Sequence, residues 1–506
     1  MELPVSLDPS GRQSLQRQLF EQLRGLILGA GLRPGTPVPP SRLLARQLGV
    51  SRNTVVLAYE RLSAEGYLQT RSALGTYVSH DLPDSSLRVD AGGIADRTSA
   101  RRQLPRSSLA FRGRAQAVVS PGKLEFDFWL GRLDPTLFPL NTWRRLVNQV
   151  LERADSGFTE YRDPTGLFEL RAAIADHLRP ARGMKVESDQ IIVVAGAQQG
   201  LNLIARLLLR EGTRVVTENP SYQGAAYLFE SYRAEVIPVP VDENGLCVDA
   251  LPPAGVALVH LTPSHQYPMG FTLSLERRMR LLDWARQTGA YVVEDDYDSD
   301  FRYRGSPLMA LMGLDQAESV IYLGTFSKSV GTGLRVGYLV LPRHLIEPAR
   351  TAKALLDNGH AWLDQAVLAE FIATGAYDTH LRRIRRTYLG RRDCLIDSLR
   401  NHFGNVMLTG TDSGMHLAWH LPAGFPSAAE LQALAAERAV GVYSLRSGAA
   451  HDFGDCAYSD KTLLFGYSSL DEARIRAGIE RVADALREWK RTRCTSARPA
   501  RTCADR

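Results

Sequence analysis

Seven short apolar runs alternate with helical segments between residues 191 and 340. They are Ile191–Val194, Arg214–Thr217, Glu235–Pro238, Val256–Leu261, Tyr291–Glu294, Val320–Leu323 and Val336–Val340. Buried strands that alternate with helices predict an α/β domain with a mainly parallel sheet. Ligands of such sheets bind outside the strand ends, so the turns that follow these runs are the first candidates for a site.

A lysine follows one of these runs in a setting that suits an aldehyde cofactor. Lys328 comes shortly after the run Val320–Leu323, with the hydroxyls of Thr325 and Ser327 before it and Arg335 after it. A lysine desolvated at a buried strand end can form a Schiff base with pyridoxal phosphate (PLP). The neighbouring hydroxyls and the guanidinium would hold the phosphate, the arginine through a bidentate contact.

The other groups that PLP needs have candidates at strand ends too. Asp295 would pair with the protonated pyridine nitrogen, and Tyr297 would face the phenolic oxygen. Tyr222 would stack on the ring face. Backbone donors at a helix start would bind the phosphate, and these are Gly196, Ala197 and Gln198. Each residue alone has an ordinary structural explanation, but their order and context together favour a PLP site.

The first quarter of the chain predicts a second kind of module. Residues 15–28 place leucines on one helical face, and a Pro-Gly turn follows at 34–35. Ser41 is a candidate N-cap of a second helix, and Gly49-Val50 forms a sharp turn. Ser51 would cap a third helix whose inward stripe is Val55, Tyr59 and Leu62. Two short helices joined at a glycine turn are typical of a helix-turn-helix.

Segments 66–70 and 75–78 then alternate as a two-stranded wing. Residues 12–79 resemble the winged-helix domain of GntR-type regulators, through Pro34-Gly35, Pro40–Arg42, 48–52 and Glu65-Gly66. The tip Ser72–Leu74 departs from the family, which usually has glycines there. The resemblance implies contacts with double-stranded DNA by Arg42, Ser51, Arg52, Asn53, Thr54, Arg71 and Thr76.

The charge distribution agrees with a polyanionic partner for this module. Residues 1–123 carry 17 Arg and Lys against 9 Asp and Glu, a balance of +8, so the other 383 residues carry −2 of the net +6. Arg and Lys that contact phosphates release counterions and raise affinity for nucleic acid. A solvated basic surface is the alternative explanation of the charge taken alone.

Composition bounds the remaining possibilities. With 506 residues, 44% hydrophobic and 23% charged, the chain is globular and long enough for two or three separate cores. No run approaches the roughly 18 consecutive apolar residues of a membrane span, and no export signal is visible at the start, so we expect a cytoplasmic protein. The five cysteines are scattered without a CxxC pair, which indicates reduced thiols and no metal site.

We therefore expect a DNA-binding domain at 1–80, a flexible basic linker rich in Pro, Ser, Gly and Arg at 81–123, a PLP-binding domain at 124–490 and a disordered tail at 491–506. Residues 124–485 look like a fold-type I aminotransferase, by the segments 161–166, 196–199, 219–222, 262–268, 295–297 and 327–335. This resemblance implies a small C-terminal α+β domain beside the parallel sheet. Tyr161 would match a tyrosine that reaches the phosphate of a neighbouring subunit, which implies a homodimer.

The whole chain is similar to the MocR/GabR-type branch of GntR regulators, but two departures bear on catalysis. Tyr267 stands at the cofactor where aminotransferases have an asparagine, and Leu464 occupies the slot of the arginine that clamps the substrate α-carboxylate. Arg446 is a candidate substitute. Without a bidentate clamp, an amino acid is poorly oriented for repeated proton transfer.

These departures favour a transcription regulator that senses PLP or a small amino compound through Lys328. The resemblance implies effectors such as PLP itself, GABA, taurine or ectoine derivatives. Two alternatives stay open: a working aminotransferase with an accessory DNA-binding domain, and a binding module with a vestigial cofactor site.

Overall fold

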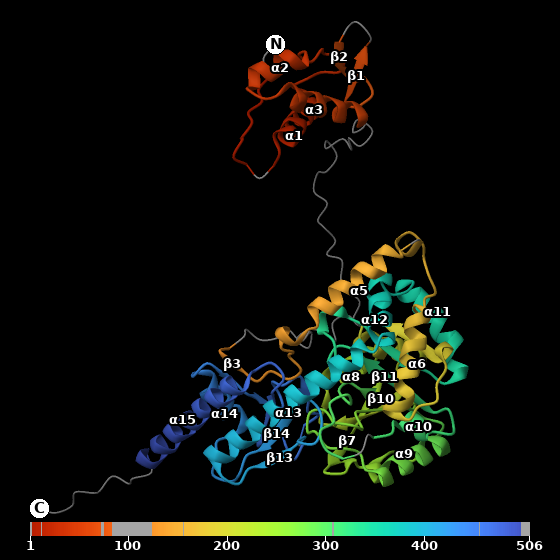
Figure 1. Ribbon diagram of the computed structural model, residues 1–506, viewed down its shortest axis with the longest axis vertical. Helices are drawn as coiled ribbons and strands as arrows, with labels where there is room; N and C mark the ends of the chain where they lie inside the picture. The colour runs from red at the N-terminus through yellow and green to blue at the C-terminus, as the bar shows by residue number, and fades with distance from the viewer. Residues whose placement is uncertain are drawn as a thin grey trace, which may run out of the picture. The chain divides into compact units, whose positions relative to one another are not determined.

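The computed structural model describes residues 3–11, 13–71, 75–82, 124–154, 156–305, 308–454 and 456–496. The chain divides into two compact units, within Met1–Pro105 and Arg106–Arg506 (Figure 1). The expected linker lies outside the described residues except at its first two positions, and so does the wing tip Ser72–Leu74.

The first unit is the expected winged helix-turn-helix. Its helices are α1 (Leu15–Leu28), α2 (Ser41–Leu48) and α3 (Arg52–Ala64), and its antiparallel wing is β1 (Leu68–Arg71) with β2 (Gly75–Val78). The turn between α2 and α3 needs Gly49, whose φ of 66° lies in the left-handed region. The predicted inward stripe of α3 is buried, and it packs against Leu19 and Leu23 of α1 in one core.

One predicted cap is correct and the other is wrong. The Ser51 hydroxyl accepts a hydrogen bond from the Thr54 backbone N–H at 3.1 Å and caps α3. Ser41, in contrast, is the first residue of α2, whose N-cap is Pro40 without a side-chain hydrogen bond. The proline ring sets an extended backbone at that position, so the helix begins one residue earlier than the capping pattern suggested.

The second unit is built on an eight-stranded sheet in the order β4-β12-β11-β10-β9-β5-β7-β8. These strands are β4 (Ile191–Val194), β5 (Arg214–Asn219), β7 (Glu235–Asp242), β8 (Gly245–Leu246), β9 (Leu258–Leu261), β10 (Tyr291–Asp296), β11 (Val320–Thr325) and β12 (Gly337–Val340). All seven expected strands are present. The neighbours from β11 to β7 run parallel, and β12 is antiparallel to both β11 and β4, so the mainly parallel sheet is confirmed.

Helices pack on both faces of this sheet (Figure 1). One face packs against α7 (Ala197–Leu208), α8 (Gln223–Ser231) and α11 (Ile346–Asp357). The other packs against α6 (Phe168–Arg182), α9 (Leu275–Thr288), α12 (Trp362–Ala373) and part of α13 (Ala376–Phe403). Burial on both faces explains why the strands are continuous apolar runs.

A smaller C-terminal layer completes the unit, as the resemblance implied. Its antiparallel sheet has the order β13-β14-β18-β16, formed by β13 (Met407–Thr409), β14 (His416–His420), β18 (Thr462–Gly466) and β16 (Tyr443–Ser444). Helix α14 (Ala428–Ala436) packs against β16 and β18, and α15 (Glu472–Ser496) packs against α13 and α14. Two strand pairs tie it to earlier parts of the chain, β15 (Val440–Gly441) with β3 (Phe126–Asp127) and β17 (Ala450–His451) with β6 (Ser221–Tyr222).

The remaining helices are short, apart from α5. They are α5 (Leu140–Glu152), α10 (Leu311–Leu314) and the 3-10 turns η3 (Pro135–Leu137), η4 (Ser156–Phe158), η5 (Ser188–Gln190), η6 (Val248–Ala250), η7 (Thr332–Leu334) and η8 (Arg343–Leu345). Helix α15 continues to Ser496, so residues 491–496, expected to belong to the tail, are helical, and residues 497–506 lie outside the described part. In that described part no helix is both long and apolar enough to cross a bilayer.

A buried ion cluster holds the end of β10. Alternation along the strand points Glu294 and Asp296 to one face and Asp295 to the other. On the first face Arg182 of α6 lies 2.9 Å from an oxygen of Asp296 and 3.7 Å from one of Glu294, and all three side chains are buried. Two of the three acidic side chains at this strand end are therefore paired with Arg182, and the third, Asp295, lies on the other face.

Replacing Arg182 should test this cluster. Arg182→Met leaves two buried carboxylates without their cation, so we expect the free energy of unfolding to fall by about 3–5 kcal/mol. Chemical denaturation followed by tryptophan fluorescence measures it. Arg179→Met on the same helix removes an exposed pair with Asp176 and should cost less than about 1 kcal/mol. Similar losses for the two variants would contradict the assigned role.

Candidate functional site

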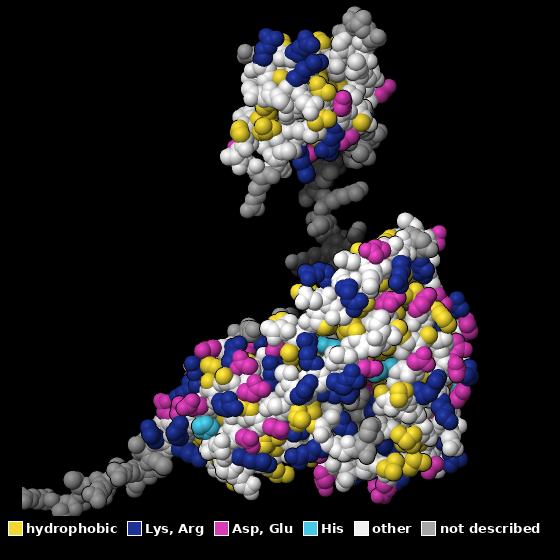
Figure 2. Space-filling model, viewed as in Figure 1, with side chains coloured by type: hydrophobic (Ala, Val, Ile, Leu, Met, Phe, Trp, Pro, Cys, Tyr) yellow, Lys and Arg dark blue, Asp and Glu magenta, His cyan; other side chains and the backbone are white. Residues whose placement is uncertain are grey.

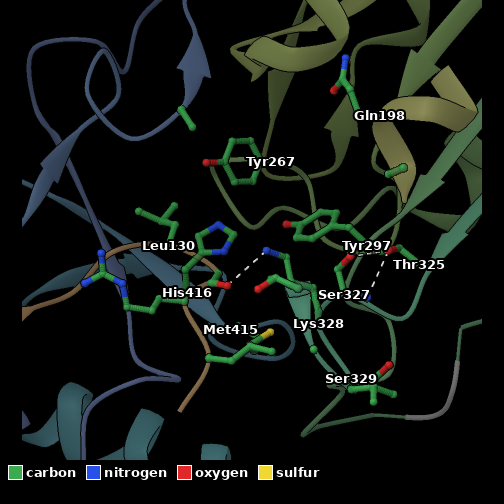
Figure 3. Close-up of a pocket in the computed structure, with 18 of the residues that line it drawn as sticks. Leu130, Gln198, Tyr267, Tyr297, Thr325, Ser327, Lys328, Ser329, Met415 and His416 are labelled. Atoms are coloured by element: carbon green, nitrogen blue, oxygen red, sulfur yellow. Dashed lines mark hydrogen bonds between the residues drawn. The ribbon is translucent and has the colours of Figure 1, made fainter. Parts of the chain in front are cut away.

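The predicted PLP residues converge on one cavity of about 1270 Å³ beyond the ends of β10 and β11. Its lining includes Ala197, Gln198, Tyr222, Tyr267, Asp295, Tyr297, Thr325, Ser327, Lys328 and Arg335. Figure 3 shows the Lys328 amine between the side chains of His416 and Tyr297, with Gln198 and Met415 on opposite sides of it. Residues that lie more than 100 positions apart in sequence thus meet at the strand ends.

Lys328 is held as a buried amine. Its Nζ donates a hydrogen bond to the Gly131 carbonyl oxygen at 3.3 Å (Figure 3). Burial lowers the pKa of Lys328, and the nearby Asp298 carboxylate partly opposes this by raising it. Gly131 allows the approach because a Cβ there would lie 2.2 Å from Nζ. A lysine whose pKa is lowered has a larger fraction of neutral, nucleophilic amine.

The phosphate end is formed by a helix start and an arginine. Gly196 is the N-cap of α7 with a φ of 80°, and a Cβ on it would lie 2.6 Å from Nη2 of Arg335. Arg335 donates to the Ala195 carbonyl at 2.9 Å, and the Ser327 backbone N–H donates to Thr325 Oγ1 at 3.2 Å. Glycine is therefore needed here for both the backbone and the close guanidinium. The start of α7 directs its backbone N–H groups toward this end, which makes it suitable for an anion.

Asp295 faces the cavity and has a partner that sequence reasoning missed. His260 Nε2 lies 3.1 Å from an Asp295 oxygen, and both side chains are buried. His260 belongs to β9, the neighbour of β10, where Val293 pairs with it in register. No local sequence signal marks such a residue, because its contact depends on the strand order. The histidine orients the carboxylate that would hold the cofactor nitrogen.

Two tyrosines form an aromatic wall over the site. The rings of Tyr222 and Tyr267 meet edge to face with centroids 5.9 Å apart. Burial, reinforced by the Asp295 charge, raises the pKa of Tyr222. The Tyr267 hydroxyl donates to the Gly448 carbonyl, and its backbone N–H donates to Thr262 Oγ1 at 2.9 Å. The Tyr267 hydroxyl is thus hydrogen-bonded to the protein backbone.

A hydrogen-bonded group behind Tyr297 was also not predicted. His265 Nδ1 lies 2.8 Å from an Asp298 oxygen and 3.1 Å from the Tyr297 hydroxyl, and that hydroxyl donates to the His265 carbonyl at 2.9 Å. The His416 ring lies 4.7 Å from the His265 ring, and its Nε2 is 3.0 Å from the Pro268 carbonyl. Burial, with the nearby His265, lowers the pKa of His416 well below its usual value. His416 is therefore a neutral donor beside Lys328.

The donor set fits PLP. Any side chain at position 196 would fill the space between Gly196 and Arg335. The start of α7 and the Arg335 guanidinium lie at one end of the cavity, where an anion could bind. The buried carboxylate of Asp295 lies beside the cavity. PLP, when bound, supplies an aldehyde for amines and an electron sink. Arg335, Thr325 and Ser327 would hold its phosphate, while Lys328 would hold its aldehyde carbon.

Neither Leu464, at the clamp position, nor the candidate substitute Arg446 lines the cavity. Leu464 of β18 is fully buried among Leu130, Met269 and Tyr443, outside the cavity lining. Arg446, the candidate replacement, is exposed and does not line the cavity. The apolar packing of Leu464 explains why an arginine is absent from that position.

Tyr161 does not reach the site of its own chain. Its side chain is 88% exposed and lies outside the cavity lining, whereas Arg335 at the phosphate end is itself exposed.

The predicted DNA contacts lie on the surface of the winged helix. Arg42, Arg52, Asn53 and Arg71 are exposed, and Figure 2 shows Lys and Arg side chains gathered over α2 in that unit. Ser51 and Thr54 share a hydrogen bond of 2.8 Å between their hydroxyls, in addition to the cap. Thr76 is partly buried in β2. The three arginines and Asn53 thus expose polar groups at the start of α3 and beside it, and the Arg71 guanidinium also lies 5.1 Å from the centroid of the Tyr77 ring.

Comparison with known proteins matches both units. Residues 15–78 match the gntR family of bacterial regulatory proteins, and residues 128–451 match the aminotransferases of class I and II. The probable rhizopine catabolism regulatory protein MocR of Rhizobium meliloti is 36% identical over 95% of each chain. The pyridoxine biosynthesis transcriptional regulator PdxR of Corynebacterium glutamicum is 34% identical over 96% of this chain and 99% of its own.

Solved aminotransferases share the fold of the second unit. The α-aminoadipate aminotransferase LysN of Thermus thermophilus, complexed with N-(5'-phosphopyridoxyl)-L-leucine, superposes with a TM-score of 0.67 at 29% identity over 77% of this chain and all of its own. The cofactor PLP follows for the second unit from this fold and its complexed relatives.

The lowered pKa of Lys328 predicts a pH dependence. Because only the neutral amine reacts with an aldehyde, the rate at which cofactor-free protein takes up PLP should reach half its plateau below pH 10.5, the ordinary lysine value. Asp298→Asn removes the charge that raises this pKa, so its midpoint should lie at still lower pH. Stopped-flow absorbance measures both rates. A midpoint that rises in Asp298→Asn would refute the electrostatic assignment.

Proposed function

Because this chain belongs to the MocR-type branch of the GntR family, we propose that PLP held at Lys328 controls how tightly its winged helix binds DNA. One observation carries the proposal: the residues that suit PLP line one cavity in a chain that also has a complete winged helix. The effector that reports through this site would be PLP itself or a small amino compound. The name of the related PdxR mentions pyridoxine biosynthesis, which favours PLP as one signal.

Each residue of the site would have a defined task. Arg335 and the α7 start would fix the phosphate, and Asp295, oriented by His260, would hold a proton on the pyridine nitrogen. Tyr222 would cover the ring face. Lys328 would hold the aldehyde carbon and release it to a competing amine. These residues would bind and orient PLP and let an amine exchange with Lys328, which is sufficient for a sensor.

Catalytic turnover is the second candidate, and the clamp position argues against it. Transamination needs a substrate fixed so that its α-proton can be removed repeatedly. Leu464 is packed in apolar surroundings, and Arg446 points to solvent outside the cavity. Sustained conversion of an amino acid to a keto acid by the purified protein would favour the aminotransferase alternative.

DNA recognition would rest on α3 and its surroundings. Arg52 and Asn53 open the helix that enters the major groove in this fold, and Arg42 and Arg71 flank it. Ser51 would contribute mainly through its cap and Thr54 through the shared hydroxyl bond. Since promoter DNA of bacteria lies in the cytoplasm, we place the protein there.

A homodimer would complete the cofactor site and would bring two winged helices together for DNA binding. Large apolar side chains are exposed on neighbouring elements of the second unit, and they are Leu140, Leu151, Phe158, Tyr161, Phe168 and Leu355. If the dimer brought these side chains into one contiguous patch, that patch would be typical of an interaction surface. Tyr161 of each chain would then reach the exposed Arg335 end of the other. Ligand that prefers one dimer arrangement would shift DNA affinity by its differential binding.

Removal of the anchor tests the proposal. Lys328→Ala should abolish the PLP-dependent change in affinity for the promoter of its own gene, because the cofactor loses its attachment. Fluorescence anisotropy with and without PLP measures this change. Lys185→Ala removes an exposed lysine of the same unit and should leave the response intact. An unchanged response in Lys328→Ala would show that the coupling does not run through this site.

A further inference from the structure

The cavity is larger than PLP alone requires. Its volume of about 1270 Å³ exceeds the roughly 300–1,000 Å³ of most small-molecule sites. The groups suited to PLP occupy the end around Arg335, Asp295 and Tyr222, described above. The remainder extends past Lys328 toward Met415, which lies opposite Gln198 in Figure 3. Space is therefore left for a second molecule beside the lysine.

The far end has an apolar wall. We call it the apolar lobe, and its members are Leu133, Leu137, Phe138, Leu334, Ile384 and Met415. All six belong to one hydrophobic cluster or pack against it. A Cβ on Gly331 would lie 3.8 Å from Phe138 and 4.0 Å from Leu334, so these two side chains face the same glycine. The lobe brings together the segment after β3, the loop after Lys328 and helix α13.

The charged side chains at this end are already paired. Arg132 binds the buried Asp127 carboxylate, which also accepts a hydrogen bond from Tyr443 at 2.6 Å. Arg391 lies 2.6 Å from an oxygen of Asp134, and both of these side chains are largely buried. Arg391 does not line the cavity itself but neutralises the lining residue Asp134. The arginine and lysine side chains of the described lining are Arg132, Lys328 and Arg335, and the last two lie at the cofactor end. A ligand with an acidic group would meet no open cation there.

We propose that the effector which competes with Lys328 is a primary amine with an uncharged apolar tail, and that the tail occupies the apolar lobe. This inference rests on the proposed function of the site. The exchange is balanced: a carbon–nitrogen bond to the ligand forms as that to Lys328 breaks, and both hydrogens of the incoming amine pass to Lys328. No oxidant or reductant is needed. His416 lies beside the exchanging nitrogen as a neutral neighbour.

Chain length gives a quantitative expectation. Each methylene that moves from water into an apolar site improves affinity about fourfold. The apparent affinity should therefore rise stepwise from propylamine to hexylamine. Butylamine should bind more tightly than 4-aminobutanoate, since the two share a chain length but the acid must bury a carboxylate without a partner.

The experiment uses the full-length protein loaded with PLP, and the readouts are visible absorbance and promoter DNA binding during amine titration. We expect the chain-length series and the preference for butylamine in both readouts. Leu137→Asn should weaken the apparent affinity for hexylamine by about tenfold or more. It should change the affinity for methylamine little, because methylamine does not reach the apolar lobe. Leu275→Asn changes an exposed leucine of α9 outside the cavity, so its affinities for both amines should equal those of the unchanged protein.

Two results would separate the possible failures. If PLP binds and controls DNA affinity but chain length has no effect, or if 4-aminobutanoate binds more tightly than butylamine, the inference is wrong and the proposed function stands. If the unchanged protein shows no absorbance from bound PLP, the proposed function fails and the inference fails with it.

Discussion

The burial of one amine is the constraint on which the site depends. Lys328 lies in the cavity with the carbonyl oxygen of Gly131 as its hydrogen-bond acceptor, and burial lowers its pKa. Such an amine is costly for stability unless it reacts or is paired. The surrounding elements are arranged around it: a glycine that permits its approach, the ends of β10 and β11, and the neutral ring of His416. The reactivity expected of the cofactor site follows from the lowered pKa of this amine.

The residues of this site suit a sensor better than an enzyme. A pocket that would hold an aldehyde cofactor, with Leu464 and Arg446 both outside its described lining, would exchange amines without guiding them through repeated proton transfer. Leu464 closes that position with apolar packing. Fusion to a winged helix supplies a use for exchange, because any ligand with different affinity for two dimer arrangements shifts the DNA-bound fraction. The exposed apolar residues around Tyr161 are where such arrangements would differ.

Much of the fold and the core of the site could be predicted from the sequence, because their signals are local. Apolar runs marked the strands, and the serine before α3 marked its cap. The missed residues act across the fold. His260 meets Asp295 only through strand order, and Arg182 neutralises Asp296 from a helix more than 100 residues away. Capping at Ser41 was wrong because proline preorganises the preceding position. Contacts of this kind are set by tertiary packing, so no local sequence pattern predicts them.

The central claim is that PLP occupancy and DNA binding are one linked equilibrium. Titrating the cofactor-free, full-length protein with PLP, while recording visible absorbance and promoter DNA anisotropy in the same cuvette, tests it most directly. Linkage requires that both signals change over the same range of PLP concentration, with a reciprocal shift in PLP affinity when DNA is present. Saturation of the absorbance with no change in DNA affinity would contradict the account.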